Sequence, residues 1–166
     1  MNILNVCYDS TNYYLIETNT GKFLVDAGWP GTVPKLLNVF KRKGVNIKNI
    51  KYFLVTHFHP DHAGLAQELE NQLGFIPELK KYMKPEQHYV EIDLDNNLNL
   101  KLNESRDFLS RIGIKGVIIS TPGHSDDSVT LILDDGSPFT GDLPGPMQLT
   151  EDSSSPAELS WKKIRS

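Results

Sequence analysis

The sequence has very little cysteine and no long apolar run. Its single cysteine, Cys7, has no second cysteine in the chain with which to form a disulfide, which favours a reducing compartment. No apolar stretch approaches the ~20 residues that a transmembrane helix needs. The first residues, Met1–Cys7, also lack the basic start and the apolar run of a signal peptide. We therefore expect a cytoplasmic protein with no membrane partner.

Positive charge is also scarce. The chain has 17 Lys and Arg against 21 Asp and Glu, for a net charge of −4, which argues against a broad surface that binds phosphate groups. The basic run Lys41–Lys43 is interpreted as the solvated end of a helix, where cations complement the helix dipole. We expect a small-molecule substrate and no nucleic-acid partner.

The composition is that of an ordinary globular protein, with 39% hydrophobic and 23% charged residues. A length of 166 residues suits one domain with a core that needs no disulfide or structural metal. We therefore predict a single domain over residues 1–166.

Strand and helix patterns alternate along the chain. Strands are predicted at Asn12–Glu17 and Lys22–Val25, joined as a hairpin, at Tyr52–Val55 as a buried strand, at Val117–Ser120 and over Val129–Leu133. Helices are predicted from Val33 to Phe40 between Thr32 and Gly44, from an Asp61 cap through buried Leu65, Ala66 and Leu69 to about Gly74, and over Glu104–Ile112 between Asn103 and Gly113. This pattern predicts an α/β fold.

The strongest signal of chemistry is the segment Thr56–His62, which holds three of the five histidines and a carboxylate within six residues. On extended backbone His57 and His59 point the same way and can share one metal. Asp61 and His62 follow where the chain turns into a helix, which suits a second cation. A lone histidine is usually satisfied by a carbonyl, but four potential ligands together favour a metal site. Zinc is the first choice, with iron or manganese next.

Two later segments add potential ligands. His124 follows Gly123 in Thr121–Ser125, and Asp142 follows Gly141. A glycine before each residue permits unusual backbone angles or a close approach. Each segment alone also fits a simple turn, so these residues gain weight only from the first motif.

The pattern His57-x-His59-x-Asp61-His62, with Gly-His124 and Gly-Asp142 after it, resembles the ligand series of the metallo-β-lactamase superfamily. The segment Leu24–Gly28 resembles its early strand-end motif. The resemblance implies an αββα metallo-β-lactamase-like sandwich, C-terminally shortened, with the metals at one edge. It also implies a first metal on His57, His59 and His124, a second on Asp61 and His62, Asp142 as a bridge, and Asp26 as a residue that orients a ligand.

The chain departs from the family pattern in several places. A last metal-binding histidine is expected after a helix that resembles Ser160–Ile164, but the sequence stops at Ser166. The remaining histidine, His88, does not match that position and is expected at the surface. The segment Gly74–Pro77 indicates that one core strand is shortened or absent. We therefore expect a weaker second metal site and an exposed sheet edge that favours self-association.

The resemblance predicts a metal-dependent hydrolase that uses a metal-bound hydroxide on an ester, thioester, lactone or related bond. Asp61 and Asp142 would hold and orient that hydroxide. The cysteine that one group of true β-lactamases carries at the position of Asp142 is absent, so antibiotic hydrolysis is not the first choice. The alternatives are a non-hydrolytic di-iron redox member, a weakly active truncated remnant, and a hydrolase of nucleic-acid phosphodiesters.

Four apolar residues flank these motifs and could line a substrate mouth. They are Trp29, Phe58, Leu143 and Met147. Because aromatic and methionine side chains more often pack inside a protein, we interpret them as packing residues.

Overall fold

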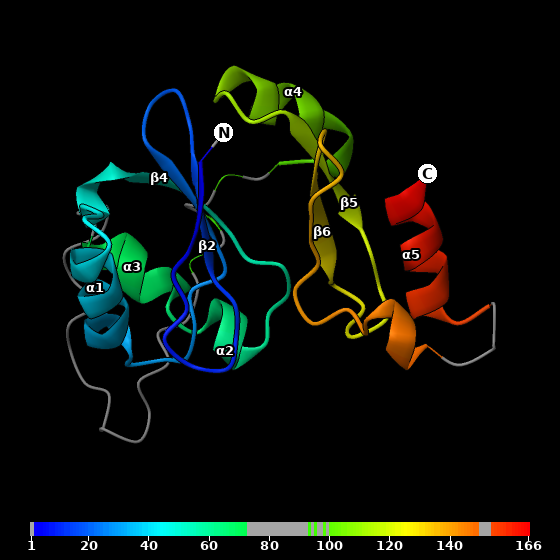
Figure 1. The fold of residues 1–166 in the computed structure, drawn as a ribbon, viewed down its shortest axis with the longest axis horizontal. Coiled ribbons are helices and arrows are strands. Elements are labelled where there is room, and N and C mark those ends of the chain that lie inside the picture. The colour runs from blue at the N-terminus through cyan, green and yellow to red at the C-terminus, as the bar shows by residue number, and fades with distance from the viewer. Residues whose placement is uncertain (1, 73–92, 94, 96–97, 99, 150–153) are drawn as a thin grey trace. The chain divides into compact units, whose positions relative to one another are not determined.

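The computed structural model describes residues 2–72, 93, 95, 98, 100–149 and 154–166. The chain divides into two compact units, Met1–Asn99 and Leu100–Ser166 (Figure 1). The single domain predicted for residues 1–166 stays a prediction. Among the described residues, no helix has the length and apolar character needed to cross a membrane.

The first unit contains a four-stranded sheet. Its strands are β1 (Ile3–Asn5), β2 (Tyr14–Glu17), β3 (Lys22–Val25) and β4 (Ile50–Leu54), in that spatial order. β1, β2 and β3 pair antiparallel, which confirms the predicted hairpin, and β4 joins β3 in parallel. β4 begins earlier than predicted, and its residues 52–54 are half-buried rather than buried.

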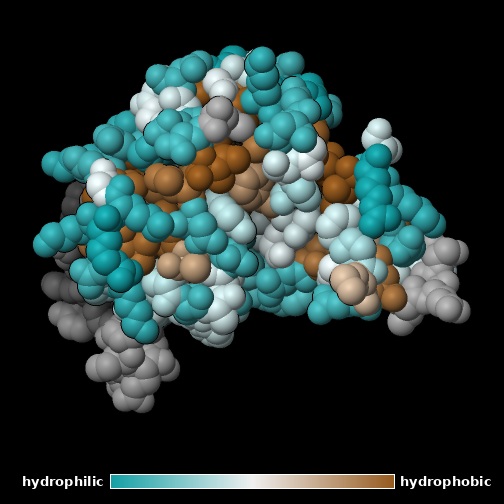
Figure 2. Space-filling view, viewed as in Figure 1, coloured by the Kyte–Doolittle hydropathy of each residue, from teal (hydrophilic) through white to brown (hydrophobic). Residues whose placement is uncertain are grey.

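Helix α1 (Val33–Arg42) connects β3 to β4, as a parallel crossover requires. Its buried residues Val33, Leu36 and Phe40 join one core with β2, β3 and the segment after β4. Burial of each such side chain stabilises the unit by roughly 1.5–3 kcal/mol. Figure 1 shows α1 and α3 on the same side of the sheet, and Figure 2 shows mainly hydrophilic residues on the outward face of α1. The helix therefore packs its apolar face against the core and exposes its polar face to solvent, as the period of its sequence predicts.

The motif segment that follows β4 turns into two short helices, α2 (Pro60–Ala63) and α3 (Ala66–Gln72). The prediction that Asp61 caps this helix is wrong, because His59 occupies the N-cap position and Asp61 lies in the first turn. Pro60 sits at the first helical position, which its fixed φ favours. Leu65, Ala66 and Leu69 are buried as predicted. The predicted end near Gly74, the segment Gly74–Pro77 and His88 lie outside the described residues.

In its described residues, the second unit has a three-stranded antiparallel sheet and two α-helices. These elements are α4 (Ser105–Arg111), β5 (Gly116–Ser120), β6 (Val129–Leu133), β7 (Pro138–Phe139) and α5 (Pro156–Arg165). Glu104, not Asn103, takes the N-cap position of α4, because residues 102–104 form a 3-10 turn before the helix. The fully buried Ser105 ties α4 to β5, since its hydroxyl oxygen accepts a hydrogen bond from the Ile118 amide at 3.1 Å.

Candidate functional site

In the first unit, the ring of His57 contacts the rings of both other motif histidines. The ring centroids of His57 and His59 lie 4.6 Å apart, and those of His57 and His62 lie 4.2 Å apart. His57 and His62 are each only 2% exposed, whereas His59 is exposed. Because imidazoles from the segment after β4 and from α2 converge, this part of the chain could hold a metal ion.

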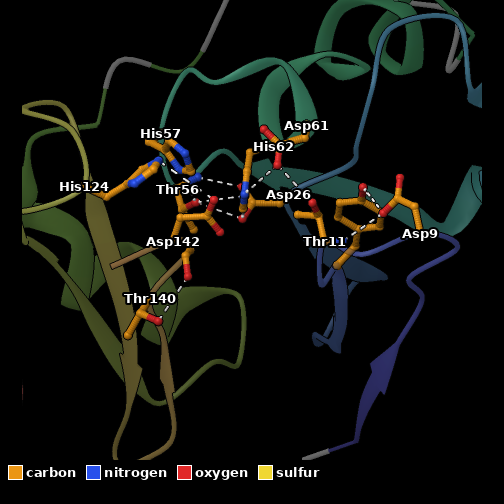
Figure 3. Close-up of polar contacts among 12 residues, drawn as sticks. Asp9, Thr11, Asp26, Thr56, His57, Asp61, His62, His124, Thr140 and Asp142 are labelled. Carbon is orange, nitrogen blue, oxygen red and sulfur yellow. Dashed lines mark hydrogen bonds and ion pairs between the residues drawn. The ribbon is translucent and has the colours of Figure 1, made fainter. Parts of the chain in front are cut away.

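Asp26, which follows β3, contacts Thr56 and one of these histidines, His62 (Figure 3). Its Oδ1 accepts a hydrogen bond from the Thr56 amide, and its Oδ2 accepts one from the Thr56 hydroxyl, each at 2.8 Å. The same Oδ2 lies 2.8 Å from Nδ1 of His62. Asp26 is therefore bonded both to Thr56 and to a candidate ligand, and the orienting role that the resemblance implies for it stays a prediction.

The hydrogen bonds of this network determine which nitrogen of each imidazole can bind a metal ion. The single hydroxyl proton of Thr56 goes to Asp26, so its oxygen accepts from Nδ1–H of His57 at 3.1 Å. A neutral His62 that donates to the Asp26 carboxylate likewise carries its proton on Nδ1. Both rings then have their lone pair on Nε2. A neutral imidazole with this tautomer is the form that ligates a metal through Nε2.

The backbone φ of Asp26 and the pKa of its carboxyl group are both unusual. Its φ is +56°, the one positive φ of a non-glycine residue in the described part of the chain, and aspartate is among the residues that tolerate this region. Burial raises the pKa of the Asp26 carboxyl, while the hydrogen bond from His62 acts in the opposite direction. The next amide, that of Ala27, donates to the carbonyl of His62 at 3.0 Å. The end of β3 is thus joined to α2 by both side chain and backbone.

Asp61 lies beside His62 and is held by a residue far away in the sequence. Its Oδ2 is 3.6 Å from Nε2 of His62 and accepts a hydrogen bond from the Thr11 hydroxyl at 3.0 Å. Sequence reasoning missed Thr11, because nothing in its local pattern points to a partner 50 residues away. Asp61 and His62 therefore lie side by side, and their sharing of one cation stays a prediction.

The second unit brings together its own two candidate ligands, His124 after β5 and Asp142 after β7. Nε2 of His124 and Oδ2 of Asp142 lie 3.9 Å apart, with side chains 29% and 45% exposed. Two ligands of one cation lie up to about 4.2 Å apart, since each bond measures about 2.1 Å. The preceding Gly123 and Gly141 have φ values of +151° and +55°. Both glycines thus adopt the unusual backbone angles that the sequence permits at these positions.

Helix α5 supports both of these loops. The Ser160 hydroxyl donates to the Pro122 carbonyl at 2.6 Å, and the Trp161 indole N–H donates to the Pro144 carbonyl at 2.8 Å. A Cβ on Gly123 would lie 2.7 Å from the Cα of Ala157, in the first turn of α5. Sequence reasoning recognised this helix but assigned no role to its side chains. Its function here is to fix the segments that carry His124 and Asp142.

The interpretation of the flanking apolar residues as packing residues is partly wrong. Leu143 is buried at 5% exposure, as interpreted. Trp29, Phe58 and Met147 are 47%, 59% and 100% exposed. In the first unit, two aromatic side chains next to the motifs therefore face solvent.

The sequence profile of the metallo-beta-lactamase superfamily matches residues 8–161. The chain belongs to the metallo-β-lactamase superfamily. Among its curated relatives in this superfamily are the lactamase-like protein nscB of Aspergillus fumigatus, 29% identical over 135 residues and 80% of this chain, and an N-acyl homoserine lactonase of a Bacillus species, 28% identical over 166 residues and 85% of this chain. An atrochrysone carboxyl ACP thioesterase of Passalora fulva is 26% identical over 147 residues and 81% of this chain. The chain spans 37%, 62% and 38% of the lengths of these three relatives.

Solved structures of the superfamily show the same fold. BJP-1, a subclass B3 metallo-beta-lactamase of Bradyrhizobium japonicum, matches with a TM-score of 0.65 and 19% identity, covering 98% of this chain and 70% of that one. A metallo-beta-lactamase family protein of Thermus thermophilus matches with a TM-score of 0.62 and 21% identity, covering 98% and 67%. The predicted metallo-β-lactamase-like α/β fold is confirmed.

Proposed function

We propose that this member of the superfamily is a metal-dependent hydrolase of an ester, thioester or lactone bond. Its metal ligands are the residues that the sequence pattern predicts: His57, His59, Asp61, His62, His124 and Asp142. The observation that carries the proposal is the hydrogen-bond network of Asp26 and Thr56. This network leaves the lone pair of the buried His57 and His62 rings on Nε2, the nitrogen that would bind a metal ion.

The residues present fit a zinc-type cation. Neutral imidazole nitrogens and carboxylate oxygens are ligands of zinc, and also of iron and manganese. His57 and His62 are protonated on the side that faces Thr56 and Asp26, as histidine ligands of metals commonly are. A network that served only to satisfy buried histidines would not need further imidazole and carboxylate groups beside them. We take zinc as the first choice of metal.

A bound cation supplies Lewis-acid chemistry, because it polarises a carbonyl oxygen and makes water more acidic. The chain's own residues have separate tasks. Because Nδ1 of His57 and of His62 is committed to Thr56 and Asp26, these histidines act as ligands and not as general bases. The carboxylates of Asp61 and Asp142 accept hydrogen bonds from the attacking water and so orient it.

The substrate class rests on the relatives. One is named a lactonase and another a thioesterase, and in both names the bond that is broken has an acyl carbon attached to oxygen or sulfur. Hydrolysis of such a bond passes through a developing oxyanion that a cation stabilises. We therefore propose an acyl ester, thioester or lactone of a small molecule as the substrate.

The test combines metal analysis with a substrate panel. The purified chain is dialysed, its metal content is measured by elemental analysis, and esters, thioesters, lactones and phosphodiesters are assayed in parallel. We expect bound zinc and hydrolysis of an acyl substrate, and loss of metal in His59→Ala and in His124→Ala, since a site with fewer ligands binds less tightly. His88→Ala is the matched control, because it removes a histidine outside the ligand series.

Retention of the full metal content in both ligand variants would contradict the assignment. Bound iron with redox activity and no hydrolysis would replace the proposal by the redox alternative, and cleavage of phosphodiesters alone would replace the substrate class.

Asp142→Asn tests the catalytic role of a carboxylate separately from shape. The substitution keeps the size of the side chain and removes its charge, so we expect the hydrolysis rate to fall by about 10²–10⁴-fold, the range typical of a lost general acid–base group. The rate is measured at saturating substrate with the metal content of the sample determined. A rate equal to that of the unmodified chain would rule out this role.

A further inference from the structure

The loop before β2 reaches a candidate ligand through one hydroxyl group. Thr11 is buried, with 9% exposure, and its hydroxyl donates to Oδ2 of Asp61 at 3.0 Å (Figure 3). Asp61 is itself 22% exposed at its side chain and lies on α2. The contact therefore joins the N-terminal loop to the first turn of the motif helix.

The loop that carries Thr11 is fixed in turn by two hydrogen bonds to one acceptor. Oδ1 of Asp9 accepts from the Thr11 amide at 3.0 Å and from the Tyr13 hydroxyl at 2.8 Å. Tyr13 has no exposed surface, and its ring contacts that of Tyr8 at 5.2 Å between centroids. The Thr11 hydroxyl thus points at Asp61 from a backbone that is anchored in the core of the unit.

We propose that Thr11 is a positioning residue for Asp61, an inference that rests on the proposed metal-binding function. A carboxylate rotates with little cost about its terminal torsion, so a ligating oxygen needs a hydrogen bond to hold one orientation. Thr11 holds Oδ2 and so sets the face that Asp61 turns to a cation. Carboxylate ligands are commonly oriented in this way, and loss of the partner lowers metal affinity by about 10–100-fold.

A purely structural role for Thr11 makes a different prediction. If the residue only filled space, valine would replace it without effect, because valine has the same branched shape. If the hydroxyl positions Asp61, valine should weaken metal binding and serine should restore it, although serine packs less well. The two roles are therefore separated by metal affinity and not by stability.

The experiment titrates the metal-free chain with Zn²⁺ in competition with a chromogenic chelator, and records the absorption spectrum of the Co²⁺ form. Thr11→Val, Thr11→Ser and Asp61→Ala are compared with the unmodified chain. We expect Thr11→Val to lower affinity about 10–100-fold and to change the Co²⁺ spectrum, and Thr11→Ser to recover most of both. The double variant Thr11→Val with Asp61→Ala should bind no more weakly than Asp61→Ala alone.

Tyr13→Phe provides a second route if Thr11→Val does not fold. It keeps the buried ring and removes the hydroxyl that donates to Asp9, so we expect a smaller loss of affinity in the same direction. Unchanged affinity in the threonine and tyrosine variants, with a loss in Asp61→Ala, would overturn the role of Thr11 and leave the proposed function standing. Absence of metal binding in the unmodified chain would overturn both.

Discussion

The candidate ligands of the two units are held in different ways. In the first unit, side chains hold them: Asp26 bonds to His62, and Thr11 bonds to Asp61. In the second unit, α5 holds the backbone next to the ligands, through hydrogen bonds to the carbonyls of Pro122 and Pro144. A bond to the side chain fixes both the direction of a ligand and the position of its proton, whereas a bond to a neighbouring carbonyl fixes only where the loop lies.

This difference predicts different consequences for substitutions. Removal of a buried acceptor leaves several donors without a partner, and each costs about 1–3 kcal/mol. Removal of one donor to a half-buried loop carbonyl costs less, because only a single hydrogen bond is lost. The first unit should therefore be sensitive to polar substitutions, and the second to changes in shape at the contact between loop and helix.

The largest effect is expected for Asp26→Ala. The variant leaves the amide and the hydroxyl of Thr56 and Nδ1 of His62 without their acceptor, so we expect the free energy of unfolding to fall by about 3–5 kcal/mol. Asp26→Asn keeps the shape of the side chain and should cost less, about 1–2 kcal/mol. Urea unfolding of the metal-free chain, followed by circular dichroism, measures both. A loss below about 1 kcal/mol in the alanine variant would show that the side-chain network does not support the unit.

A smaller effect is expected for Gly123→Ala, which tests the second unit. The new methyl group would lie 2.7 Å from the Cα of Ala157, on a backbone with φ of +151°, so the loop or α5 must shift, at about 1–3 kcal/mol. Gly136→Ala is the matched control, since Gly136 also has a positive φ of +88° but no atom within 4 Å of a Cβ. The alanine at Gly123 should lower the midpoint of thermal unfolding more than the alanine at Gly136. Equal shifts would mean that the contact with α5 does not constrain the loop.

The smallest effect is expected for Ser160→Ala. The variant removes the buried hydroxyl that donates to the Pro122 carbonyl, which should cost about 1 kcal/mol. Lys163→Ala is its control on the same helix, because the Lys163 ammonium contacts the Ser120 carbonyl at 3.4 Å from an exposed position and should contribute almost nothing. Urea unfolding of both variants shows whether the hydrogen bond of Ser160 stabilises the unit or whether any substitution on α5 has the same effect. If Ser160→Ala is as stable as Lys163→Ala, the hydrogen bond of Ser160 does not stabilise the second unit.

Much of the fold was predictable because its signals are local. The hairpin of β2 and β3, helix α1 and the strands β5 and β6 follow from side-chain period and turn residues, and the structure places them within a few residues of the prediction. Errors arose where two local preferences compete. At α2, proline at the first helical position shifted the N-cap to His59 and left Asp61 within the helix. At α4, a 3-10 turn moved the start of the helix past Asn103.

The candidate site was predictable only in part, for a physical reason. Clustering within the segment Thr56–His62 is visible in the sequence, and the role of Asp26 followed from the family resemblance. Thr11, Ser160 and Trp161 are ordinary residues in ordinary local patterns, and their partners lie 50, 38 and 17 positions away. Contacts of this kind depend on how the chain is folded and leave no periodic trace.

The hydrogen bonds from α5 to the two loops of the second unit also imply an order in which parts of the chain become structured during synthesis. The groups that bond to Asp26 belong to Thr56 and His62, whereas the loops of His124 and Asp142 receive hydrogen bonds from Ser160 and Trp161 of α5. Because a chain is synthesised from its N-terminus, the ribosome has released the whole first set of partners long before the second is complete. We expect protease protection of stalled nascent chains to appear in the first unit before it appears at the loops of the second, and simultaneous protection would contradict this order.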